Sequence, residues 1–82
     1  MYYVYVLKGT NTNKCYIGST SDLKKRVISH NSGQNKATKH DTWNLVYYES
    51  YLDKTLALRR ELRLKNHGKA IQELKIRIGF ES

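Results

Sequence analysis

Two tyrosine-bearing runs separated by a short polar turn constrain this chain most, because together they specify a hairpin near its start. Residues 2–7 read Tyr-Tyr-Val-Tyr-Val-Leu, a continuous β-branched and aromatic run. Apolar side chains on both faces predict a central strand that is covered on both sides. Residues 9–13 carry Gly and Asn, which tolerate turn conformations, and residues 15–17 predict a returning strand that Gly18 ends.

The rest of the chain predicts three helices and one more strand. Hydroxyl side chains followed by Asp22 indicate the start of a helix over residues 22–31, with Gly33 past its end. The third strand is predicted over residues 43–51, after a loop over residues 34–42. Helices then follow over residues 54–67, capped by Asp53 and closed by Gly68, and over residues 69–78. The order β-β-α-β-α-α predicts a single α+β domain over residues 1–82 with a small, mainly antiparallel sheet.

The charge of the chain favours a polyanionic partner. Fifteen Lys and Arg stand against seven Asp and Glu, a formal net charge of +8. Such a balance is most often found in proteins that bind nucleic acid, although a basic surface without a partner has the same composition. No single basic residue can be assigned a contact from sequence.

Cysteine content and hydropathy indicate where the chain works. One cysteine cannot form an internal disulfide, which suits a reducing compartment, and we expect a cytoplasmic location. We see no signal peptide and no apolar run near the roughly 18 residues of a membrane span, so no membrane partner is expected.

Glu61 breaks the apolar pattern of its helix. Three of its four neighbours at i±3 and i±4 are apolar, which turns the carboxylate toward core side chains; the four are Ala57, Leu58, Leu64 and Lys65. A carboxylate that faces a core is a candidate functional group. The alternative is an ordinary i, i+4 ion pair between Glu61 and Lys65.

Arg26 and His30 also stand four residues apart, beside a row formed by Leu23 and Val27 that should face the core. We therefore expect both to lie at the edge of the core. The planar guanidinium of Arg26 suits phosphate, and His30 can relay a proton or hold a phosphate oxygen. The alternative is a solvated helix face.

Tyr5 and Tyr16 are either core aromatics or groups that take part in proton transfer. A free phenol has a pKa near 10 and is a poor base at neutral pH, but a cation nearby favours the phenolate. Mg²⁺ accepts a site with one carboxylate, waters and substrate phosphate, so Glu61 alone suffices. The single cysteine and three histidines lack the paired spacing of structural zinc sites.

These residues resemble, in order, the motifs of the GIY-YIG endonuclease superfamily, especially its small stand-alone members. Tyr3-Val4-Tyr5 looks like the first tripeptide and Tyr16-Ile17-Gly18 matches the second. Arg26 and His30 follow at the family's spacing, and Glu61 looks like its metal-binding glutamate. Tyr3 replaces the first glycine of the name motif, and Ser19 stands where some members have a lysine. The match covers essentially the whole chain.

The resemblance implies a three-stranded antiparallel sheet flanked by helices and a divalent-metal-dependent endonuclease that cuts DNA with weak or structure-based specificity. By that analogy Glu61 holds Mg²⁺ or Mn²⁺, Tyr5 or Tyr16 helps to deprotonate the attacking water, Arg26 steadies the phosphate charge and His30 assists. DNA repair is the expected context. The alternatives are a nucleic-acid-binding module that no longer cuts and an accessory subunit that depends on a protein partner for targeting.

Overall fold

The computed structural model describes residues 1–32 and 41–80, and it shows the α+β fold that the sequence predicts. Within these ranges the chain forms a three-stranded antiparallel sheet and three helices in the predicted order. The elements are β1 (Tyr2–Gly9), β2 (Cys15–Thr20), α1 (Leu23–Asn31), β3 (Trp43–Tyr51), α2 (Lys54–Asn66) and α3 (Gly68–Ile78).

The first strand lies in the middle of the sheet, as its continuous apolar run predicts. The strand order is β2-β1-β3, and both neighbours are antiparallel to β1. Tyr5 of β1 is paired with Gly18 of β2 on one side and with Tyr48 of β3 on the other. The outer side of β2 therefore has no neighbouring strand within the described ranges.

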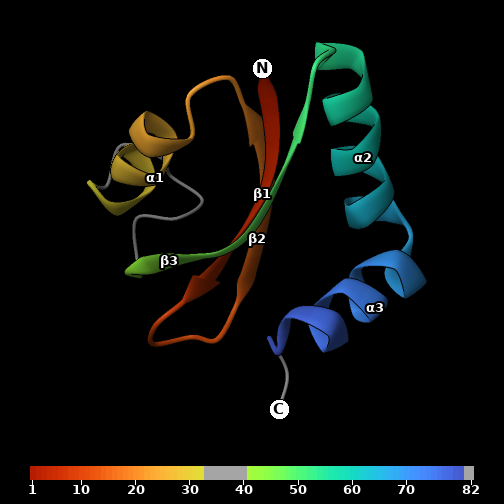
Figure 1. Ribbon diagram of the computed structural model, residues 1–82. Coiled ribbons are helices and arrows are strands. Elements are labelled where there is room, and N and C mark those ends of the chain that lie inside the picture. Colours follow the sequence, from red (N-terminus) through yellow and green to blue (C-terminus); the bar gives the residue numbers. More distant parts are fainter. Residues whose placement is uncertain (33–40, 81–82) are drawn as a thin grey trace.

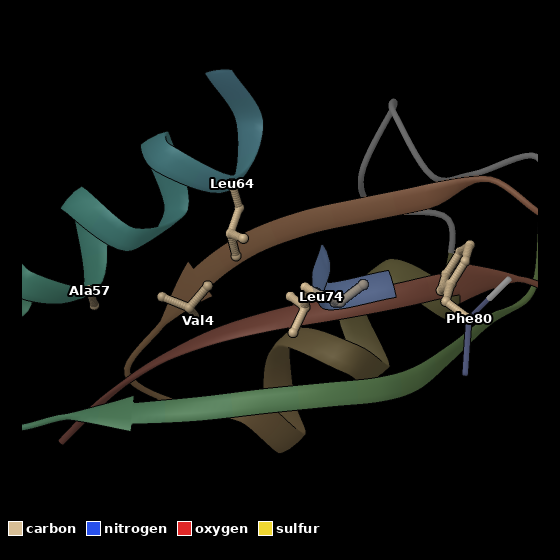
Figure 2. Packing of buried hydrophobic residues seen from close by; sticks show 6 residues of the cluster. Val4, Ala57, Leu64, Leu74 and Phe80 are labelled. Atoms are coloured by element: carbon tan, nitrogen blue, oxygen red, sulfur yellow. The ribbon is translucent and has the colours of Figure 1, made fainter. Parts of the chain in front are cut away.

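Alternate residues of β1 build two separate cores, one on each face of the sheet. Figure 1 shows α1 on one side of the sheet and α2 and α3 on the other. Tyr5 and Leu7 pack on the α1 side with Trp43. The opposite core, most of which is shown in Figure 2, consists of Val4, Val6, Ala57, Leu64, Leu74 and Phe80. Side chains of successive strand residues point to opposite faces, so one strand supplies both cores.

α1 begins one residue later than expected, and β2 ends two residues later. β2 does not end at Gly18 but continues to Thr20, because Ser19 pairs with Val4 and Thr20 with Tyr3. Asp22 is the N-cap of α1, and its side chain accepts a hydrogen bond from the Lys25 amide at 3.0 Å. The hydroxyl residues that looked like the start of a helix thus extend the strand and its turn.

Gly68 does not close α2 as expected, but is the first residue of α3. His67 separates the two helices with an extended backbone, φ −115° and ψ 95°. The glycine that does terminate a helix is Gly79, whose left-handed φ of 76° ends α3. The predicted stop at Gly33 and most of the predicted loop, residues 34–40, lie outside the described residues.

Candidate active site

A buried hydrogen bond joins Tyr5 of β1 to His30 in the last turn of α1. The Tyr5 hydroxyl lies 2.8 Å from His30 Nε2, and the exposed fractions of the two residues are 1% and 0%. Burial lowers the pKa of His30, and the Arg26 guanidinium lowers it further. His30 is therefore a neutral imidazole at neutral pH.

The expectation that Arg26 and His30 both lie at the edge of the core is wrong. His30 is fully enclosed, because the rings of Tyr5 and Tyr16 pack against it with centroids 5.8 and 4.6 Å away. Arg26, one turn earlier, is exposed. Leu23 and Val27 face the core as predicted and pack against the Tyr5 cluster.

Tyr16 lies at the border between this core and solvent. Its ring is roughly parallel to that of Tyr5, with the centroids 6.4 Å apart, and it meets the Trp43 ring edge-on at 6.3 Å. Tyr16 is half-buried, whereas Tyr5 is enclosed. Of the two phenols, Tyr16 is the one that remains within reach of water.

Gly18 makes room for Tyr5. A Cβ atom added at Gly18 would lie 2.6 Å from Tyr5 Cζ and 3.0 Å from Tyr5 Cε1, well inside van der Waals contact. The Tyr5 ring therefore lies across the backbone of β2 at its cross-strand partner. Any larger residue at this position would push the phenol away from His30.

Both oxygens of the Glu61 carboxylate have partners. Ser19 of β2 donates its hydroxyl to Oε1 at 2.5 Å, and Lys65 donates to Oε2 at 2.6 Å. The Glu61 side chain is only 16% exposed. The ion pair that was the alternative explanation for Glu61 is thus formed, and the carboxylate is also anchored to the sheet.

The helical surroundings of Glu61 are less apolar than the sequence indicates. Ala57 and Leu64 are buried, as expected, but Leu58 is 42% exposed and does not face the core. The sequence gives no sign of Ser19 as a partner, because the strand is expected to end at Gly18. With the strand continued, the alternation of β2 places Ser19 on the same face as Ile17, towards α2.

The Tyr5–His30 pair and Glu61 approach β2 from opposite faces of the sheet. They nevertheless interact: burial raises the pKa of Tyr5, Tyr16 raises it further, Arg26 lowers it and the Glu61 carboxylate raises it. The Tyr5 hydroxyl is thus bonded to His30 and has its pKa changed by three further groups, which are Tyr16, Arg26 and Glu61. Tyr5, Tyr16 and His30 are in direct contact, whereas Arg26 and Glu61 act on the Tyr5 hydroxyl through their charge.

Arg26 opens onto a small cavity at the end of β2. The cavity has a volume of about 220 Å³ and joins residues of α1, β2 and α2. Ser19, the partner of Glu61, lines the same cavity as Arg26 and Lys54. A phosphate group in this cavity would meet two cationic side chains beside the anchored carboxylate.

The donor set around Glu61 suits a loosely held hard cation. No group of three or more His, Cys, Asp or Glu side chains within residues 1–32 and 41–80 is arranged to hold a metal. That excludes a cage built from these residues alone. Mg²⁺ keeps several waters and is commonly bound by one or two carboxylates plus substrate phosphates, and a single anchored carboxylate fits that mode.

A small antiparallel sheet carries phenols, an imidazole, a guanidinium and a carboxylate around one strand, and these groups suit phosphodiester chemistry. The chain belongs to the GIY-YIG family: residues 1–75 match the family model described as the GIY-YIG catalytic domain. Membership supports a nuclease-type function and implies nucleic-acid binding, and the nucleases of this family generally depend on divalent metals.

The chain is similar over most of its length to several small proteins. A UPF0213 protein of Staphylococcus epidermidis is 39% identical over 77 residues, which cover 92% of both chains. A UPF0213 protein of Halobacterium salinarum is 37% identical over 75 residues, 89% of this chain and 96% of the relative. A UPF0213 protein of Bacillus pumilus is 36% identical over 77 residues, 92% of this chain and 78% of the relative. No solved structure matches the chain significantly.

Across residues 1–32 and 41–80, the helices are too short or too polar to cross a membrane.

Proposed function

We propose that this protein is a divalent-metal-dependent endonuclease, a single domain over residues 1–82 that hydrolyses phosphodiester bonds in DNA with weak or structure-based specificity. The observation that carries the proposal is the convergence on β2. Tyr5 is hydrogen-bonded to His30, and the same hydroxyl is influenced by Tyr16, Arg26 and Glu61. We further propose that it acts in the cytoplasm, in DNA repair.

Glu61 is the residue that would hold the metal, Mg²⁺ or Mn²⁺. Bound there, the cation would polarise the phosphate and make a bound water more acidic. Ser19 fixes the orientation of the carboxylate through its 2.5 Å hydrogen bond, which leaves Oε2 as the more adaptable oxygen. Lys65 pairs with Oε2 and is 44% exposed, so its side chain can move into solvent when a cation arrives.

We assign proton transfer from the attacking water to Tyr16, because water can reach its half-buried side chain. Tyr5 is a poor candidate for the base, since its pKa is raised and its hydroxyl is enclosed with His30. The Tyr5–His30 pair instead supports the Tyr16 ring from behind, with the His30 and Tyr16 centroids 4.6 Å apart.

Arg26 would stabilise the phosphate as its negative charge grows in the transition state. Its guanidinium is exposed and opens onto the cavity that Ser19 also lines. The guanidinium is planar and stays protonated, so in that position it can donate hydrogen bonds to two oxygens of one phosphate.

The test is cleavage of supercoiled plasmid and branched DNA with Mg²⁺, with Mn²⁺ and with a chelator. Glu61→Gln keeps the shape of the side chain and removes its charge, so we expect cleavage to fall at least a hundredfold. Asp53→Asn makes the same chemical change at an exposed carboxylate that caps α2, and since asparagine caps helices equally well, cleavage should stay intact. Equal cleavage by the wild type and Glu61→Gln would refute the assignment.

One observation favours a second function, a module that binds nucleic acid without cutting it. The Lys65 ammonium already neutralises Glu61 at 2.6 Å, as a structural ion pair would. This alternative predicts salt-sensitive binding that does not depend on Mg²⁺ or on Glu61. Cleavage that is lost in Tyr16→Phe while binding survives would exclude it.

A further inference from the structure

A groove between α2 and α3 carries an excess of positive charge. Its volume is about 580 Å³, and its floor includes the buried Leu74. Four cationic side chains line it against one carboxylate, and His67 sits where the two helices meet. The charged and ionisable residues that line it are Arg60, Arg63, His67, Lys69, Glu73 and Arg77.

This groove is separate from the candidate active site. Arg60 and Glu61 are neighbours in sequence, but they point to opposite edges of the sheet. Arg60 binds Glu49 of β3 at 2.7 Å, whereas Glu61 binds Ser19 of β2 at 2.5 Å. The helix α2 therefore lies between the two sites, with the groove on the β3 side.

Most of the positive charge in the groove has no acidic partner. Among residues 1–32 and 41–80, ion pairs form only between Arg60 and Glu49 and between Lys65 and Glu61. Arg63 and Lys69 are exposed and take part in neither. Like charges gathered in one groove repel one another and oppose folding, so the arrangement favours an anionic ligand there.

Arg60 is held in place for such a ligand. Glu49 accepts hydrogen bonds from Arg60 Nε at 2.7 Å, from the Tyr47 hydroxyl at 2.6 Å and from the Tyr51 hydroxyl at 2.5 Å. Only the Nε edge of the guanidinium is used in the contact with Glu49, and Arg60 still lines the groove. Arg77 is tied to the same network, since its guanidinium donates to the Tyr47 hydroxyl at 3.4 Å.

We propose that the α2–α3 groove binds the phosphate backbone of a nucleic acid at a segment away from the bond to be cut. Guanidinium groups match phosphate geometry, and contacts of this kind add affinity without reading sequence. The choice of nucleic acid over an acidic protein rests on the proposed function. The groove adds to that function a second point of attachment, on the side of α2 remote from Glu61.

The test is binding of a fluorescent duplex by anisotropy, in chelator so that no cleavage occurs, at salt concentrations from 50 to 200 mM. Arg63→Gln/Lys69→Gln removes two groove charges, and Lys14→Gln/Lys24→Gln removes two exposed charges from the β1–β2 loop and α1. If both groove residues contact phosphate, the slope of log affinity against log salt falls by about 1.8. The affinity gap between wild type and groove variant then narrows about tenfold from 50 to 200 mM salt.

Each outcome decides the matter. A groove variant with the slope and affinity of the control variant overturns the inference. The inference is also overturned if poly-glutamate displaces the fluorescent duplex from the wild type as effectively as unlabelled DNA does, which would instead indicate an acidic protein partner. If the groove variant has a reduced salt slope but the wild type never cuts DNA, the groove proposal is upheld and the proposed function fails. If the wild type cuts DNA and the groove variant keeps the wild-type slope, the proposed function is upheld and the groove proposal fails. Urea unfolding midpoints equal to that of the wild type establish that both variants are folded.

Discussion

The strongest structural test is a single methyl group at Gly18. The Tyr5 ring crosses β2 so closely that a Cβ atom at Gly18 would lie 2.6 Å from Tyr5 Cζ. Tyr5 cannot swing away freely, because its exposed fraction is 1% and its hydroxyl is bonded to His30. Gly18→Ala must therefore displace the ring or distort β2.

The cost of Gly18→Ala has three contributions. Overpacking of a well-packed core costs about 1–3 kcal/mol, and losing the Tyr5–His30 hydrogen bond costs roughly another 1 kcal/mol. Alanine restricts the unfolded chain, which returns about 0.4–1 kcal/mol. We expect a net loss of stability of roughly 1–3 kcal/mol, which lowers the melting temperature by at least about 4 °C in a chain of this size.

Urea unfolding followed by far-UV circular dichroism measures this loss of stability. The comparison holds if the wild type and the variant have the same m, the slope of the unfolding free energy against urea concentration. Gly68→Ala is the matched control, because a Cβ atom there meets nothing within 4 Å and the residue is helical. Alanine at Gly68 should leave stability unchanged or raise it by up to about 1 kcal/mol. If Gly18→Ala unfolds at the same urea concentration as the wild type, the close approach of Tyr5 to β2 is refuted.

Four further predictions concern stability. A hydrogen bond from the Thr12 hydroxyl is the main cause that lowers the pKa of Asp41 to about 2. The Asp41 carboxylate therefore stabilises the fold fully above about pH 4 and loses this effect as the pH falls towards 2. In Asp41→Asn the urea midpoint should fall less over this acid range. The pKa of His30 is lowered by burial, so the unfolded chain binds the proton first and stability should fall from pH 8 to pH 5, but less so in His30→Gln. Glu49→Gln weakens a network of three hydrogen bonds and should cost about 1–2 kcal/mol in thermal melts. Leu64→Ala should cost about 2–5 kcal/mol and the exposed Leu62→Ala about 0.5 or less; equal effects would contradict the packing shown in Figure 2.

The fold was largely predictable because its signals are local. The run over residues 2–7 is apolar on both faces, as a central strand must be, and the β3 bounds agree at both ends with the expected residues 43–51. Errors arose where one residue type has two uses. Gly68 looked like a helix stop but begins α3, and the hydroxyls after Gly18 looked like a helix cap but extend β2.

The sequence singles out the candidate residues but does not give their geometry. Spacing places Arg26 and His30 on one side of a helix, yet only packing against Tyr16 decides that His30 is buried and Arg26 is not. The hydrogen bond between Ser19 and Glu61 joins residues 42 apart, so no local pattern could indicate it.

The alternation along β1 ties the shape of the molecule to its chemistry. Val4 and Val6 build the core beneath α2 and α3, while Tyr5 and Leu7 face α1. A one-codon insertion or deletion between these positions would therefore turn the phenol under the wrong helices and the valines under the imidazole. Such a mutation would disrupt both hydrophobic cores and the candidate site together, so it cannot produce a folded protein that lacks only its activity.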